Sequence, residues 1–215
     1  MNNKYPTFEV CIGNYGYYAE GVLRDAWLTL PVTHEEFADF IKANRLSDPL
    51  HEEIYISDYN IPYGFEGLHI FNESANTDDL NMLASQMLLM PRECEVVAKY
   101  LDAGCDEPNS IVELMNMICQ AYGLGYHEYT VEASTPEKCL AYTLLDETGE
   151  YQKIVDLGLE PYFDFEKFGR NAAMDVCAGE DGYVDPCNDF DPELYSREEL
   201  RDIYTPHYKT SLMAA

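Results

Sequence analysis

Residues 7–31 read TFEVCIGNYGYYAEGVLRDAWLTLP, and this stretch indicates how the chain begins to fold. Residues 7–12 predict a short strand, which the turn-forming residues 13–16 (GNYG) end. Residues 26–30 (AWLTL) predict a second strand, stopped by Pro31. We therefore expect two neighbouring strands at the start of the chain, with Trp27 assigned to packing.

Residues 32–61 add a helix and a third strand to this pair. Thr33 and Glu36 form a capping box, and Phe37, Phe40 and Ile41 follow at the spacing of an apolar helical stripe. Residues 53–57 (EIYIS) predict the third strand. We expect residues 1–61 to form an α+β domain with an antiparallel sheet and a helix.

Residues 62–122 change to a helical period. Apolar stripes predict a helix from Thr77, a second from Pro91 to Gly104, and a third that follows a capping box of Ser110 and Glu113. The methionines of these stripes indicate core packing, with a groove for a partner as the alternative. This segment predicts a central helical domain.

Residues 123–215 mix both periods. They predict a strand at 126–131, a helix from Pro136 to Leu145, an aromatic helix over 162–168 ended by Gly169, and a last helix at 196–204. An acidic, loop-rich stretch follows Gly179. The expected fold class is therefore α+β, in an elongated chain of three small domains: 1–61, 62–122 and a mixed C-terminal domain, 123–215, with an acidic tail.

The composition separates a folded acidic protein from a disordered one. The chain has 215 residues, 13 Lys+Arg and 40 Asp+Glu, a formal net charge of −27, and 47% hydrophobic residues. That apolar content suffices for a core, unlike the composition of a disordered acidic chain. No apolar run reaches the roughly 20 residues of a membrane helix, and residues 1–6 do not begin a signal peptide. We expect a soluble, cytoplasmic protein.

The charge also limits the partners. Nucleic acid and anionic membrane surfaces are repelled, so we expect neither as a ligand. Solubility needs a net charge of only about 2–8 in a small domain, and the acidic excess is spread over all three segments. The partners should be basic proteins, or proteins that normally hold a polyanion. Solubility and adaptation to salt are the alternative explanations of the acidic excess.

Signatures of catalysis and of cofactor binding are absent from the sequence. It contains no GxSxG, HExxH, phosphate-binding glycine loop or CxxC spacing, and its seven Cys and five His are scattered. His34-Glu35-Glu36 and His51-Glu52-Glu53 resemble acid/base pairs, but they also fit a helix start and a solvated loop. Asp181, Asp185, Asp189 and Asp191 lack EF-hand spacing, which leaves adventitious divalent binding as the alternative. We expect no enzyme, no cofactor and no metal site.

The carboxylates themselves are the candidate functional groups. At about 1.7 Å of B-DNA per negative charge, 27 charges correspond to roughly 46 Å of duplex. Carboxylates near helix starts and on polar faces therefore predict a ladder that resembles DNA phosphates. The candidates are Glu35, Glu36, Asp39, Asp78, Asp79, Glu93, Glu95, Asp102, Glu113, Glu137, Asp146, Glu147, Asp164, Glu166, Glu198, Glu199 and Asp202.

Three motifs, in order, resemble the ArdA-type antirestriction proteins. Residues 8–31 resemble the family's opening: a strand, an Asn-x-Gly-x-Tyr turn, a Gly-x-Leu step and a Trp-containing strand ending in Pro. Residues 56–63 (ISDYNIPY) resemble its Asp-Tyr-x-x-Pro-aromatic segment. Residues 162–170 (YFDFEKFGR) resemble its aromatic–acidic helix ending in Gly-Arg. The resemblance covers about residues 5–185.

This resemblance implies a DNA mimic, usually a homodimer, encoded on mobile genetic elements. Such a protein would occupy the DNA-binding groove of type I restriction–modification enzymes, at their DNA-recognition and methyltransferase core. The alternatives are an acidic module that sequesters another basic or DNA-binding protein, and an enzyme or metal protein with an unrecognised site. The aromatic cluster Tyr162, Phe163, Phe165 and Phe168 is either a dimer contact or an intradomain core.

Overall fold

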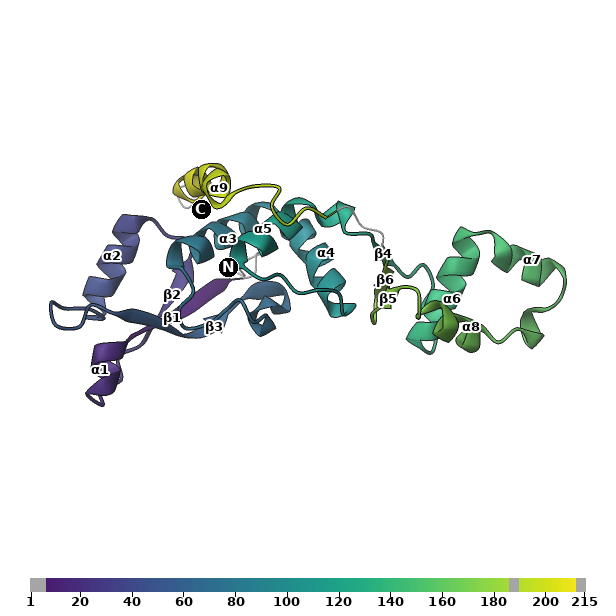
Figure 1. The fold of residues 1–215 in the computed structure, drawn as a ribbon, viewed down its shortest axis with the longest axis horizontal. Helices are drawn as coiled ribbons and strands as arrows, with labels where there is room; N and C mark the ends of the chain where they lie inside the picture. The colour runs from purple at the N-terminus through teal and green to yellow at the C-terminus, as the bar shows by residue number, and fades with distance from the viewer. Residues whose placement is uncertain (1–6, 186–189, 212–215) are drawn as a thin grey trace. The chain divides into compact units, whose positions relative to one another are not determined.

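The structure, a computed structural model, describes residues 7–185 and 190–211 and confirms the α+β class (Figure 1). The chain divides into two compact units. The first contains the chain up to Cys94, Pro108–Cys119 and the part from Asp191 onward; the second contains Glu95–Glu107 and Gln120–Phe190. The predicted division into three domains is not confirmed, because the C-terminal part groups with the first unit.

The first unit is built on an antiparallel sheet of β1 (Phe8–Asn14), β2 (Ala26–Leu30) and β3 (Ile54–Asn60) in the order β2-β1-β3. The three predicted strands are thus confirmed. The register pairs Cys11 with Trp27 and with Asp58, and it shifts in β1 between Cys11 and Ile12. Val10 and Ile12 are fully buried and contribute the core face.

The assignment of Trp27 to the core is wrong. Leu28 and Leu30 are 8% and 7% exposed, whereas Trp27 is 48% exposed. Successive side chains of a strand point to opposite faces, so Leu28 and Leu30 take the buried face of β2 and leave Trp27 on the other. The alternation within residues 26–30 already contains this information.

The connections of the sheet begin with side-chain caps. The Asn14 side chain accepts a hydrogen bond from the Tyr17 amide at 3.2 Å, so a short helix, α1 (Tyr15–Ala19), stands where the sequence predicts a turn. The predicted capping box is confirmed at the start of α2 (His34–Ala43): the Glu36 amide donates to Thr33 Oγ1 and the Thr33 amide donates to Glu36 Oε2. A 3₁₀ segment, Pro62–Gly67, follows β3.

Helices α3 (Thr77–Leu89) and α5 (Ile111–Cys119) provide the helical core of the first unit. Leu80, Leu83 and Leu114 are fully buried there, and Met82, Met87, Met115 and Met117 are buried with them, as core packing requires. Helix α4 (Pro91–Asp102) begins in the first unit and continues into the second. Its predicted start at Pro91 is confirmed.

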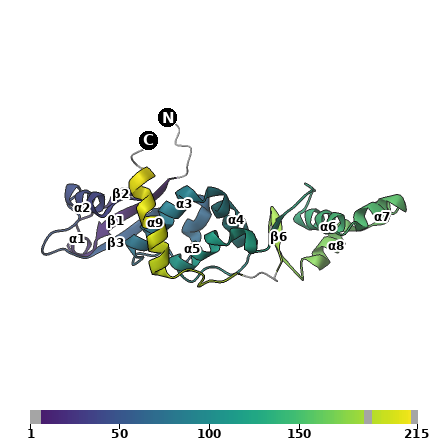
Figure 2. The ribbon, with the colours of Figure 1, turned by 90° about the horizontal axis from the view of Figure 1, so that it is seen from above.

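Helix α9 (Arg197–Ser211) packs against α3 and α5 (Figure 2), although the sequence predicts that it belongs to a C-terminal domain. Its buried side chains Leu200 and Tyr204 face this core. Ser85 Oγ donates to the Tyr204 carbonyl at 3.0 Å, and Arg197 pairs with Asp79 at 2.6 Å. The C-terminal segment therefore completes the first unit.

The second unit combines a small antiparallel sheet with the larger part of α4 and with three further helices. The sheet contains β4 (Tyr126–Glu128), β5 (Cys177–Ala178) and β6 (Gly182–Val184) in the order β4-β6-β5, so a hairpin stands where the sequence predicts acidic loop. Helices α6 (Pro136–Glu147), α7 (Glu150–Asp156) and α8 (Phe165–Ala172) follow one another, with a 3₁₀ turn, Glu160–Tyr162, before α8.

Gly169 does not end the aromatic helix as predicted. Helix α8 continues to Ala172, and Gly169 is buried against α6. A Cβ at this position would lie 1.7 Å from the Glu137 carbonyl oxygen. The glycine is therefore required for the close approach of two helices, which a cap signal in the sequence does not reveal.

Candidate functional site: surface carboxylates

The structure places all the predicted carboxylates at the surface. Asp79, Glu93, Glu113, Glu137 and Glu166 are half-buried, and the other candidates are exposed. They lie on helices, at helix starts or in the turns that follow, in both units. Their local environments divide them into carboxylates with a structural partner and carboxylates without one.

Several candidates stabilise helix starts. Besides Glu36, Asp164 is the N-cap of α8 and accepts from the Lys167 amide, and Glu199 accepts from the Ser196 amide at 2.9 Å. Glu113 accepts from the Asn109 amide at 2.8 Å, so only the Ser110 half of that predicted capping box forms. Backbone hydrogen bonds lower the pKa of Glu36 and of Glu199, because they favour the charged carboxylate.

A second group is engaged by side chains. Asp79 is paired with Arg197, and Glu166 lies 3.1 Å from Arg170 and 3.6 Å from Lys138. Glu147 accepts a hydrogen bond from the Tyr183 hydroxyl at 2.9 Å. These carboxylates hold elements together within one unit, and their charges are partly compensated.

The remaining candidates have neither an ion pair nor a side-chain hydrogen bond with residues 7–185 and 190–205, whose side chains the structure describes. Some occupy one face of a helix: Glu35 and Asp39 on α2, and Glu198 and Asp202 on α9, are four residues apart. Like charges at this spacing destabilise a helix by a few tenths of a kcal/mol. The uncompensated set is Glu35, Asp39, Asp78, Glu93, Glu95, Asp102, Glu137, Asp146, Glu198 and Asp202.

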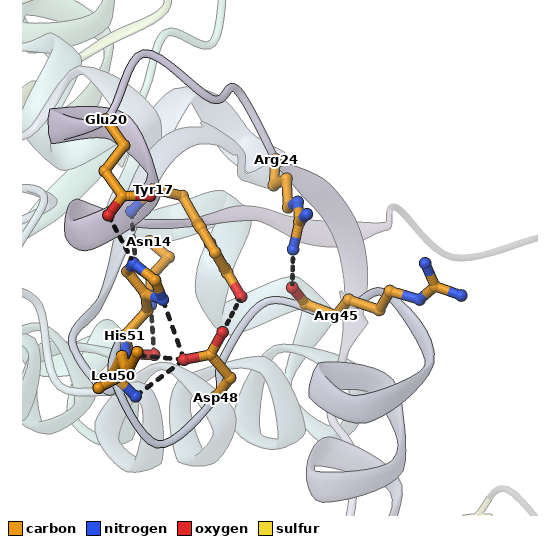
Figure 3. Close-up of polar contacts among 8 residues, drawn as sticks. All are labelled: Asn14, Tyr17, Glu20, Arg24, Arg45, Asp48, Leu50 and His51. Carbon is orange, nitrogen blue, oxygen red and sulfur yellow. Dashed lines mark hydrogen bonds and ion pairs between the residues drawn. The ribbon is translucent and has the colours of Figure 1, made fainter.

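A polar network around His51 is the feature that sequence reasoning missed (Figure 3). His51 Nδ1 lies 2.9 Å from Asp48 Oδ1, and its Nε2 lies 3.2 Å from Glu20 Oε1. The Tyr17 hydroxyl donates to Asp48 Oδ2 at 2.7 Å, and the Tyr17 ring stacks on the imidazole. The sequence predicts a solvated loop at His51, yet only 13% of its side chain is exposed. The Asp48–His51 spacing of three residues is the available signal.

The network stabilises the charged forms of His51 and Asp48 rather than activating a nucleophile. Hydrogen bonds that the imidazole donates to Asp48 and then to Glu20 raise the pKa of His51, and the Tyr17 hydroxyl and backbone amides keep the pKa of Asp48 well below its usual range. Asn14 Nδ2 also donates to the His51 carbonyl at 3.0 Å. These contacts fasten α1 and the loop after it to the turn before β3, which indicates a structural brace.

The aromatic residues proposed for a dimer contact lie mostly in the core of the second unit. Phe165 is 7% exposed and packs with Ala141 and Leu145, and Phe163 and Phe168 pack against this cluster. Tyr162 is 85% exposed. The packing favours an intradomain core for the three phenylalanines. The exposed Tyr162 side chain is the one of the four that could still contact a second chain.

Metal-binding clusters and membrane-spanning helices are both absent from residues 7–185 and 190–211. No group of three or more His, Cys, Asp or Glu side chains there is arranged to hold a metal ion, and Asp189 of the predicted acidic loop lies outside them. No helix within the described ranges is long and apolar enough to cross a bilayer.

These features define the class of the chain: an acidic α+β protein that presents unpaired carboxylates along its helices. The family model described as Antirestriction protein (ArdA) matches residues 10–185, and the chain belongs to this family. Membership confirms the resemblance of the three sequence motifs and assigns the chain an antirestriction function. No curated protein sequence matches the chain.

Proposed function

We propose that the chain acts as a DNA mimic that occupies the DNA-binding groove of type I restriction–modification enzymes. The observation that supports this best is the set of unpaired carboxylates at helical spacing. Residues four apart on a helix are separated by about 6 Å along its axis, close to twice the 3.4 Å rise per phosphate of one DNA strand. Pairs such as Glu35 with Asp39 can therefore meet lysine and arginine side chains placed to contact phosphates.

The energetics of such binding are those of protein–DNA association. A groove lined by Lys and Arg gains affinity from neutralising many charges, each of which contributes little. Glu35 and Glu198 lie in the first turns of α2 and α9, where a negative charge favours the helix. Asp39 and Asp202 lie beyond the first turn and repel them, so helix stability does not account for Asp39 and Asp202. A partner that supplies cations relieves this repulsion, and the acidic surface is thus suited to binding rather than to catalysis.

The proposal includes a cytoplasmic site of action, where restriction enzymes meet incoming DNA, and a homodimer. Two chains of net charge −27 repel one another, so association needs an apolar contact with few charges. Tyr162 is the exposed member of the aromatic cluster and is the residue we propose for that contact. Tyr162→Ser should lower the mass measured by light scattering without unfolding the chain; an unchanged mass would exclude Tyr162 from the interface.

Displacement of DNA tests the proposed function. A fluorescent duplex bound to a purified type I methyltransferase core should be released as the protein is titrated in, and excess unlabelled duplex should compete with the protein for the core. A basic protein that does not bind DNA serves as the control partner. Binding to the enzyme without release of the duplex would contradict mimicry, and equal binding to the control would favour the broader alternative of an acidic sequestering module.

A further inference from the structure

The second unit contains an open cavity of about 950 Å³ between α6, α7 and the segment that leads into α8. Lys138, Tyr142 and Asp146 line it from α6 at positions four residues apart, which places them on one face of that helix. Tyr151 of α7 and Glu160 of the 3₁₀ turn line the same cavity.

Aromatic rings form the walls of the cavity. Tyr142 stacks on Phe165 with ring centroids 4.5 Å apart, and Tyr151 meets Tyr142 edge-on at 5.6 Å. Phe163 packs on Phe165 at 4.8 Å. Because Phe165 is buried and anchors these rings, the walls are fixed before any ligand arrives.

The charges around the cavity are unequal. Its acidic lining residues are Glu132, Asp146, Glu160, Asp164 and Glu166, against Lys138 as the basic one. Lys138 is already held by Glu166 at 3.6 Å and by Ser134 Oγ at 3.3 Å. Glu160 accepts from the Tyr151 hydroxyl at 2.9 Å, and Asp146 has no side-chain partner within the described chain.

We propose that this cavity binds an arginine side chain of a basic protein partner. Aromatic faces attract a cation, and the planar guanidinium both stacks on rings and donates paired hydrogen bonds to a carboxylate such as Asp146. The acidic lining repels phosphate and other anions. This inference rests on the proposed function only for the identity of the partner. The cavity would add one specific contact to the many weak contacts made by the surface carboxylates.

Acidic residues are common in this chain, so carboxylates around a cavity do not by themselves indicate a binding site for arginine. The combination of a cavity, ring walls and an unpaired carboxylate separates this site from the acidic helix faces. Asp146→Asn and Asp39→Asn make the matched pair of variants, because each removes one unpaired, exposed charge, the first inside the cavity and the second on α2 of the other unit.

The test is a titration of the full chain with capped Gly-Arg-Gly, followed by NMR of tyrosine rings at near-physiological salt. The rings of Tyr142, Tyr151 and Tyr162 should shift together, while that of Tyr122, which is 72% exposed elsewhere, should not. The neutral isostere Gly-citrulline-Gly should bind at least about fivefold more weakly than the arginine peptide, because it lacks the cation. Equal binding of the citrulline peptide would overturn the proposal.

The variants separate the cavity from general charge attraction. Asp146→Asn should weaken the arginine peptide about threefold, and Asp39→Asn should leave its affinity within the error of the titration. Equal losses in both variants would overturn the proposal. The DNA-displacement assay decides the proposed function separately: a chain that displaces DNA but does not bind the arginine peptide in the cavity retains that function and loses this site.

Discussion

Gly169 shows how a single missing side chain sets the distance between two helices. Alanine favours a helix interior over glycine by about 1 kcal/mol, so propensity alone predicts that Gly169→Ala stabilises the second unit. Its Cβ would instead lie 1.7 Å from the Glu137 carbonyl oxygen, which is backbone and cannot move alone. We expect the free energy of unfolding to fall by about 1–3 kcal/mol, measured by urea denaturation.

Gly123→Ala is the control for that change, because a Cβ there meets nothing within 4 Å and its backbone is not left-handed. Its free energy of unfolding should change by less than about 0.5 kcal/mol. A Gly169→Ala variant as stable as the unmodified chain would show that α6 and α8 separate without cost.

His51 makes the stability of the first unit depend on pH. Asp48 and Glu20 raise its pKa above the roughly 6.5 of the unfolded chain. The stability that its positive charge contributes is therefore fully present below about pH 6.5 and is lost as the pH rises through the raised pKa. His51→Gln should lower the melting temperature most at about pH 5.5, with a smaller difference from the unmodified chain at about pH 9.

Asp48 sets the acidic limit of the pH range in which this network stabilises the first unit. Its pKa is lowered, so its contribution is present above about pH 3.9 and is lost only as the pH falls through the folded-state value. His34→Gln, at the exposed start of α2, is the control for replacing a histidine by glutamine outside this network. An equal loss of melting temperature for His51→Gln at about pH 5.5 and pH 9 would contradict a charged brace.

At the scale of elements, α5 holds the segment that leads into α9. Asn116 of α5 is fully buried, donates to the carbonyls of Pro192 and Tyr195, and accepts from the Tyr195 amide at 2.9 Å. Asn116→Ala leaves these backbone groups without partners, at a cost of about 2–3 kcal/mol in the free energy of unfolding. Hydrogen exchange should show faster opening of α9, and Asn109→Ala, at an exposed position of the same region, should not.

If α9 kept its protection in Asn116→Ala, the contacts of Tyr204 and Arg197 would suffice to hold the helix. Both are long-range: the Tyr204 hydroxyl accepts from Gln86 Nε2 at 3.1 Å, and Arg197 pairs with Asp79. The attachment of α9 is thus spread over α3 and α5, and its loss should destabilise the first unit before the second.

At the scale of the whole molecule, the acidic excess predicts binding that depends steeply on salt. If carboxylates replace phosphates, the affinity of the protein for the purified target in the absence of DNA should weaken at least tenfold between about 50 and 200 mM salt, because the target's cations exchange with counterions. A direct binding titration across that range measures the effect. An affinity that does not change with salt would argue against mimicry.

The same distributed binding limits the effect of any one carboxylate. Glu35→Gln alone should change binding by no more than about 1 kcal/mol, whereas joint neutralisation of Glu35, Asp39, Glu198 and Asp202 should weaken it much further. The melting temperature of each variant verifies the fold. A lone carboxylate whose loss abolished inhibition would indicate a specific site in place of a ladder.

The sequence by itself determined the features that depend on neighbours a few residues apart. The strands around residues 8–31, the capping box of Thr33 and Glu36, the helix starts at Thr77 and Pro91 and the acidic surface follow from local period, cap chemistry and net charge. The same local motifs carried the family resemblance, which the match over residues 10–185 confirms.

Tertiary structure alone decided the contacts that join distant segments. The place of α9 against α3, the approach of Gly169 to Glu137, and the pairing of His51 with Glu20 each link residues more than 30 positions apart. Such contacts depend on how buried faces meet, and no local period encodes that. For the same reason the sequence listed the carboxylates, and only the folded chain separated those that cap or pair from those left unpaired for a partner.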